Sequence, residues 1–148
     1  MAITAMTWIV ALGGVLIMGV LGSLQLVAVL RPQSDWVVKN VYGGSPDDTD
    51  RTAYFAYHQG WAWADVLIVV PLQLAGSIGM LLGTRWGFLF GLLASVPFCY
   101  SAIPLFIWDR DLHLRKPTAF YWLIVWGMFP AFGLLEGSYC FWRLLTVM

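Results

Sequence analysis

The residues best able to do chemistry in this chain are an acid and a histidine close to apolar sequence. Segment 57–65 reads Tyr-His-Gln-Gly-Trp-Ala-Trp-Ala-Asp. On a helix, His58, Trp61 and Asp65 fall at positions i, i+3 and i+7, which share one face, although Gly60 could break that register. Asp65 lies inside an apolar stretch, where an ionisable side chain is costly and marks a candidate functional site. Asp65 and His58 are therefore the candidate catalytic residues for acid–base work. The structural alternative has His58 at the membrane interface and Asp65 facing water or pairing with Arg110.

Glu136 is a second acid at membrane depth, near the opposite end of its own apolar stretch. With a rise of 1.5 Å per residue, Asp65 and Glu136 should differ in depth by roughly 14 Å, which excludes a carboxylate pair. Glu136 could bound a pocket or pair with Arg85 or Arg143. The amides of Gln25 and Gln73 also lie at this depth, where they could bond across helices or contact a ligand.

The two cysteines give no sign of a metal or redox site. Cys99 and Cys140 lie in separate apolar stretches, and the sequence has no CxxC motif and no Cys/His cluster. We expect free, buried thiols that behave as small apolar side chains, with a dithiol redox enzyme as the remote alternative. The sequence predicts no metal and no cofactor.

The composition predicts an integral membrane protein. Of 148 residues, 60% are hydrophobic and 11% are charged, against roughly 45–50% and 25% in soluble chains. This excludes disorder and argues against a soluble globule. Eight basic and eight acidic residues cancel, so the chain lacks the basic surplus of a nucleic-acid binder.

Four stretches are long enough to cross a bilayer, which needs about 20 apolar helical residues. They cover residues 7–30, 61–83, 87–108 and 119–142. Each is continuously apolar rather than alternating, which favours helices over strands. We therefore predict one all-α domain over residues 1–148, a four-helix membrane bundle in contact with lipids.

Prolines and glycines set the expected shape of this bundle. Pro71, Pro97, Pro104 and Pro130 should kink their helices, either as simple bends or by opening a pocket. Three GxxxG pairs allow close helix contacts, either within the chain or in a homo-oligomer. These pairs are Gly79 with Gly83, Gly87 with Gly91, and Gly133 with Gly137.

Tryptophans and the longest loop complete this picture. Two interfacial belts are expected, one of Trp8, Trp86 and Trp142 and one of Trp61, Trp63, Trp108 and Trp122.

Residues 36–58 are too apolar for a free loop, so we expect them to cap the bundle as a lid. The basic residues favour a cytoplasmic position for the two larger loops.

The order of these residues resembles the emopamil-binding protein (EXPERA) family, over roughly residues 23–137. The resemblance rests on Asp65 followed by Pro71, on Ile103-Pro104, and on Trp126 followed by Pro130. It implies a four-helix bundle whose cavity binds sterols or lipophilic amines, with Asp65 facing the cavity. Trp126 would stabilise a cationic ligand, as an indole face can. The ligand-binding candidates are Asp65, Trp126, Trp61, Gln73, Tyr100 and Glu136.

This chain departs from the family's catalytic pattern. The isomerases of the family carry a His-x-x-x-Glu pair on the first span, and this sequence has neither residue there. Ser23 and Leu123 stand where relatives have an aspartate and an asparagine. These departures leave only Asp65 and His58 for proton transfer.

Four functions fit these observations. The first is binding of a sterol-like or cationic amphiphilic ligand, in a cavity between the second, third and fourth helices bounded by Asp65 and Trp126. The second is a sterol or lipid double-bond isomerase. The third is an oligomeric small transporter or channel subunit, and the fourth is a structural subunit of a membrane complex. A filled core without a cavity is the competing structural expectation.

Four spans place both termini on one side of the membrane. Cysteines introduced at Ala2 and Met148 should therefore react with an impermeant reagent from the same side of sealed vesicles. Labelling from opposite sides would contradict an even number of spans.

Overall fold

The computed structural model describes residues 2–42, 51–111 and 119–146, without the side chains of 51–55, 105, 108–111, 121 and 125. This part of the chain is helical and contains no strand. Its α-helices are α1 (Ala5–Leu30), α2 (Asp35–Asn40), α3 (Arg51–Ala64), α4 (Val70–Leu81), α5 (Arg85–Tyr100), α6 (Ala102–Asp111), α7 (Ala119–Tyr121) and α8 (Phe129–Leu145). Two π-helical segments, η1 (Asp65–Val69) and η2 (Trp122–Met128), lead into α4 and α8.

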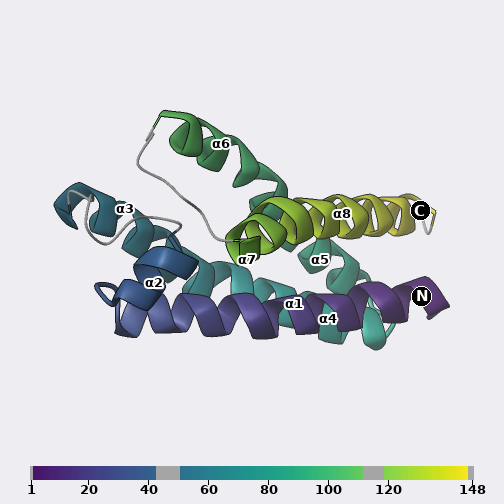
Figure 1. Cartoon of the computed structure of the whole chain (residues 1–148). Helices are drawn as coiled ribbons and strands as arrows, with labels where there is room; N and C mark the ends of the chain where they lie inside the picture. The colour runs from purple at the N-terminus through teal and green to yellow at the C-terminus, as the bar shows by residue number, and fades with distance from the viewer. Residues whose placement is uncertain (1, 43–50, 112–118, 147–148) are drawn as a thin grey trace.

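Four helical stretches are long and apolar enough to cross a membrane: Ala5–Leu30, Ala56–Leu81, Arg85–Pro104 and Trp122–Leu145. The prediction of an all-α, four-helix membrane bundle is confirmed, and the chain is an integral membrane protein. The second span begins and ends earlier than the predicted 61–83. The third runs as α5 to Tyr100 and then bends into α6, between Pro97 and Pro104, where a kink was predicted. Beyond that bend, α6 turns away from the bundle (Figure 1).

Exposed tryptophans lie at the end of the bundle that carries the chain termini. Trp8, Trp86 and Trp142 are exposed and belong to the parts of α1, α5 and α8 nearest the chain termini (Figure 1). Trp63 and Trp122 are also exposed, on the second and fourth spans. Exposed tryptophans at the termini end match one interfacial belt, and the second belt stays a prediction. The side chain of Trp108, expected in the second belt, lies outside the described residues.

The second and fourth spans share one local arrangement. In each, a π-helical segment leads into an α-helix that has proline as its second residue, Pro71 in α4 and Pro130 in α8. In the first of these, the Val70 N–H donates to the Asp65 carbonyl, five residues back. A widened turn of this kind gives the proline ring room beside the preceding turn. It also changes which backbone carbonyls are left without an N–H donor. The predicted kinks are therefore π-turns in these two spans.

Close packing through glycine joins the spans near the end that carries the termini. A Cβ atom on Gly79 would lie 2.5 Å from the Gly87 Cα, and one on Gly76 would lie 2.7 Å from the Gly91 nitrogen. On α8, a Cβ on Gly133 would lie 2.7 Å from the Phe98 Cβ.

The third GxxxG pair is completed by Gly137, where a Cβ would lie 2.7 Å from the Ser95 Oγ. Gly83, with φ of 67°, makes the turn between α4 and α5. Gly79, Gly87, Gly91, Gly133 and Gly137 thus face neighbouring helices of the same chain. Gly133 and Gly137 also line an open groove, so a homo-oligomer through the glycine faces stays a prediction.

The connection after α1 packs on the bundle. Val37, Val38 and Tyr42 are buried against Ala28 of α1 and Ala62 of α3. The lid expected over residues 36–58 is thus present for residues 37–42, although Trp36 points outward and is 53% exposed. Residues 43–50 lie outside the description.

The α4–α5 contact gives a stability prediction. Gly87→Ala puts a methyl group against the Gly79 backbone, so it should destabilise the bundle by about 1–3 kcal/mol, as overpacking does. Gly19→Ala is the matched control, because nothing lies within 4 Å of its Cβ position. Thermal unfolding in detergent should show a lower melting temperature for the first variant only. Equal melting temperatures would contradict the close contact.

Candidate functional site

A cavity of about 90 Å³ lies between the helical spans and the segment that follows α2. All four spans contribute to its wall, and the segment after α2 closes one side. Its apolar and aromatic lining consists of Leu21, Val41, Tyr42, Tyr57, Trp61, Val69, Pro97, Phe98 and Phe129. Its polar lining consists of Gln25, His58, Asp65 and Ser101. The cavity is therefore an aromatic chamber with few polar groups, at the depth where the second span becomes π-helical.

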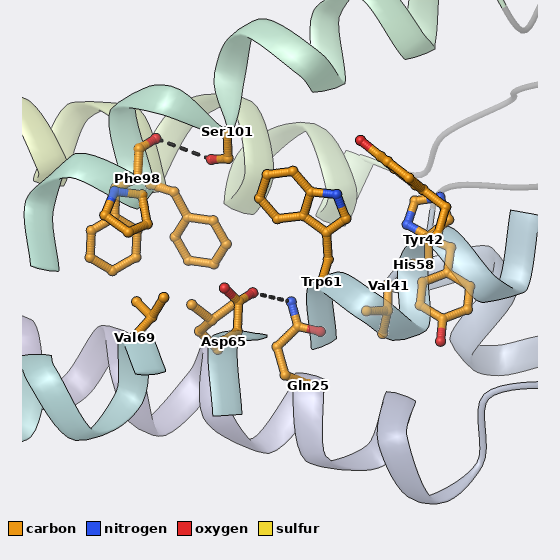
Figure 2. Close-up of a pocket in the computed structure, with 13 residues that line it drawn as sticks. Gln25, Val41, Tyr42, His58, Trp61, Asp65, Val69, Phe98 and Ser101 are labelled. Carbon is orange, nitrogen blue, oxygen red and sulfur yellow. Dashed lines mark hydrogen bonds between the residues drawn. The ribbon is translucent and has the colours of Figure 1, made fainter. Parts of the chain in front are cut away.

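Asp65 is the acidic group of this cavity. Its Oδ2 atom accepts a hydrogen bond of 2.8 Å from Gln25 Nε2 of α1. Figure 2 shows the carboxyl facing the space between Trp61 and Phe98. The amide orients one carboxyl oxygen and keeps the acid beside the cavity. Asp65 thus has a neutral hydrogen-bond donor as its partner, while the Arg110 side chain, considered as a partner from sequence, lies outside the description.

His58 forms the other polar wall with two tyrosines. Its imidazole stacks on Tyr42, with ring centroids 4.6 Å apart and an interplanar angle of 18°. Tyr57 meets the same imidazole edge-on at 5.4 Å. Burial raises the pKa of the Tyr42 phenol above its usual value, so this hydroxyl stays protonated, and it donates a 3.4 Å hydrogen bond to the Ala28 carbonyl.

The structure brings His58, Trp61 and Asp65 to one cavity, as the i, i+3, i+7 spacing predicts. Trp61 also stacks on Tyr100 at 5.9 Å. Tyr100 itself is exposed and lines a larger, open groove between α5, α6 and α8 instead of the cavity.

Trp126 lies outside the cavity lining. Its ring packs against Trp122 at 5.8 Å and against Phe106 at 6.1 Å. The expectation of one cavity bounded by Asp65 and Trp126, between the second, third and fourth helices, is therefore corrected. The first span and the lid supply walls that the sequence did not assign, through Leu21 and Tyr42. In the sequence, the apolar character of residues 36–58 was the feature that could have indicated a place for Tyr42 in the cavity wall.

Gln73 and Glu136 form a separate pair in the core. Gln73 Nε2 donates to Glu136 Oε1 at 2.6 Å, and both side chains are fully buried. Neither lines the cavity. Arg143, one partner expected for Glu136, instead donates to the Tyr139 hydroxyl at 2.9 Å and lies 4.8 Å from the centre of the Phe88 ring. As expected from their depths, Asp65 and Glu136 do not meet: each is bonded to a different glutamine.

The sulfur atoms lie apart from the cavity. Cys99 and Cys140 are free, and Cys140 Sγ contacts Met80 Sδ at 3.7 Å. Among the described residues, no group of three or more His, Cys, Asp or Glu side chains is placed to hold a metal ion.

Comparison with known proteins adds one similarity. Over 94 residues the chain is 33% identical to human monocarboxylate transporter 11, and the match covers 60% of this chain and 20% of the transporter. The chain thus spans about a fifth of the length of this relative. The chain is a polytopic membrane protein. No family model and no solved structure matches it.

The stack of Tyr42 on His58 gives a prediction for the lid. Tyr42→Ala removes the ring that joins α2 to α3, so the amide protons of residues 37–42 should exchange faster with solvent. Tyr42→Phe keeps the ring and loses only a long hydrogen bond, so its exchange should stay near that of the wild type. Hydrogen exchange of the protein in nanodiscs measures both. Equal protection in all three proteins would show that the ring does not hold the lid.

Proposed function

We propose that this protein binds a lipophilic ligand that carries a basic nitrogen, with the nitrogen beside Asp65. The observation that carries the proposal is a membrane-depth carboxyl group that opens onto an aromatic cavity. A carboxylate attracts a cation, and the faces of Trp61 and the two tyrosines add favourable contacts with the same charge. An ionisable side chain at this depth is energetically costly, and such residues in membrane spans mark functional sites. The resemblance to the emopamil-binding protein family supports the same ligand class.

The size of the cavity limits what enters it. About 90 Å³ is smaller than the roughly 300–1,000 Å³ of pockets that enclose a drug-sized ligand. The cavity thus suits the polar head of an amphiphile, not an entire sterol. A neighbouring hollow of about 40 Å³ shares Leu21, Gln25, Val41 and Phe129 with the cavity and is also lined by Phe120 and Ile124. We place the apolar tail along this hollow, between α1 and η2, where it can reach the lipid.

A double-bond isomerase is a second candidate, favoured by one observation. Asp65 and His58 line the same cavity, so one group could add a proton to an alkene while the other removes one. This reaction requires the cavity to widen around the ring system of a sterol. Conversion of a double-bond isomer by the purified protein, lost in both Asp65→Asn and His58→Ala, would favour it over binding alone.

A transport role is a third candidate, and it rests on the similarity to the monocarboxylate transporter. Membrane carboxyls at two depths, Asp65 and Glu136, suit proton coupling. A proteoliposome assay with a pH gradient and a small radiolabelled carboxylate tests this. Uptake that requires the gradient and is lost in Asp65→Asn would support transport.

The binding proposal predicts a selective effect of Asp65. Asp65→Asn should lower the affinity for a long-chain tertiary amine about tenfold or more, because a hydrogen bond to a charged group contributes about 1.5–3 kcal/mol to binding. A neutral alcohol with the same chain should change less than about twofold, since it lacks the charge. Asp35→Asn, an exposed acid of α2, is the matched control and should affect neither ligand. Ligand-induced quenching of tryptophan fluorescence in nanodiscs measures these affinities.

The aromatic wall gives the second half of this test. Trp61→Ala should weaken both ligands, because Trp61 lines the cavity. Trp126→Ala should have a smaller effect, because its ring packs outside. Unchanged amine binding in both Asp65→Asn and Trp61→Ala, with the fold intact, would refute the proposed site.

A further inference from the structure

The pair formed by Gln73 and Glu136 is a polar site that the proposed ligand does not reach. Both side chains have 0% exposure, and a single hydrogen bond of 2.6 Å joins Gln73 Nε2 to Glu136 Oε1. The remaining oxygen of each group, Gln73 Oε1 and Glu136 Oε2, is buried and has no hydrogen-bond partner. Two acceptors without donors in one contact are unusual, because buried polar atoms are nearly always bonded.

The charged groups around Glu136 do not neutralise a carboxylate. Helices α1 and α4 contain no charged residue, and the one charge of α5, Arg85, is exposed at the start of that helix. On α8 itself, Arg143 is directed to Tyr139. Among the described residues, the Tyr139 phenol accepts from that guanidinium, and the Cys140 thiol, which lies beside Gly91 as Glu136 does, contacts Met80. A buried carboxylate without a cation is strongly unfavourable.

We propose that Glu136 is a proton-binding site, and that its bound proton is donated to the amide oxygen of Gln73. A proton on Oε2 provides a donor for that atom and a partner for Gln73 Oε1, so both unpartnered atoms are satisfied together. The two side chains then form a ring of two parallel hydrogen bonds, amide N–H to carboxyl oxygen and carboxyl O–H to amide oxygen. No charge remains in the centre of the bundle, and the second and fourth spans are joined there.

The walls of the site favour a proton over a larger cation. A Cβ atom on Gly14 would overlap the Gln73 amide, and one on Gly91 would lie 3.3 Å from Glu136 Oε1 and 3.0 Å from Cys140 Sγ. Glycine on α1 and α5 therefore leaves room for the two polar side chains and little more. A hydrated metal ion needs several further oxygen ligands.

Infrared spectroscopy of the 148-residue chain in nanodiscs at neutral pH tests the site. We expect a carbonyl stretch of a protonated carboxyl group that is lost in Glu136→Gln and kept in Asp65→Asn. This second variant separates the site from the ligand cavity, so the proposed function can fail while this inference stands. Absence of the band in the wild type, or its persistence in Glu136→Gln, would overturn the proposal.

Stability provides a second measurement. Glu136→Gln can still form a ring of two N–H···O bonds, so its melting temperature should stay within a few degrees of the wild-type value. Gln73→Leu removes the partner of the carboxyl group and should lower the melting temperature by more. If Glu136→Gln does not fold, the exchanged pair Gln73→Glu with Glu136→Gln restores one acid and one amide, and should recover both the fold and the band.

A metal cation at this site would give a different result. The wild-type melting temperature would then rise with sodium or potassium at constant ionic strength, and this rise would be absent in Glu136→Gln. That outcome would refute the proposal of a bound proton.

Discussion

The close approach of α4 to α5 is the contact on which the shape of this bundle depends. Gly76 and Gly79 meet Gly91 and Gly87 backbone to backbone, so the second and third spans touch near the end that carries the chain termini. At the other end, the third span bends after Tyr100 and α6 leaves the bundle (Figure 1). Because the helices are close together at one end of the bundle and diverge at the other, a space remains between them at the diverging end. Tyr42 and the buried face of α2 pack over this space, and the cavity lies beneath them.

The two acids at membrane depth have the same kind of hydrogen-bond partner in two different environments. Asp65 and Glu136 each accept a hydrogen bond from a glutamine of a neighbouring span, Gln25 and Gln73 respectively. The amide is a neutral donor, so it orients a carboxyl group without bringing a second charge into the membrane. The environments differ in access. Asp65 borders a cavity, whereas Glu136 is sealed in the core, which separates a group suited to contact a ligand from one suited to join helices.

Much of the architecture could be predicted from sequence because the bilayer imposes simple rules on length and polarity. The four spans, the tryptophan belt at the termini end and the packed lid all follow from where apolar and aromatic residues occur. The shared face of His58, Trp61 and Asp65 was also predicted, since those residues are close in sequence. Trp126 was misplaced because the rotation of a helix about its own axis is set by its neighbours. The local sequence gave no indication that Trp126 would pack against Phe106.

The π-turn of the second span has a consequence for insertions and deletions. A π-turn holds one more residue than an α-turn, and each residue of an α-helix advances by about 100°. Asp65 and Gln73 are eight positions apart, which in an unbroken α-helix would separate them by about 80° around the axis. With one residue absorbed by η1 they differ by only about 20°, and both turn toward α1, where Asp65 meets Gln25 and Gln73 adjoins Gly14. The alignment of the two polar positions thus depends on the number of residues between them, so losing one residue from this segment would disturb the span more than most substitutions on its lipid-facing side.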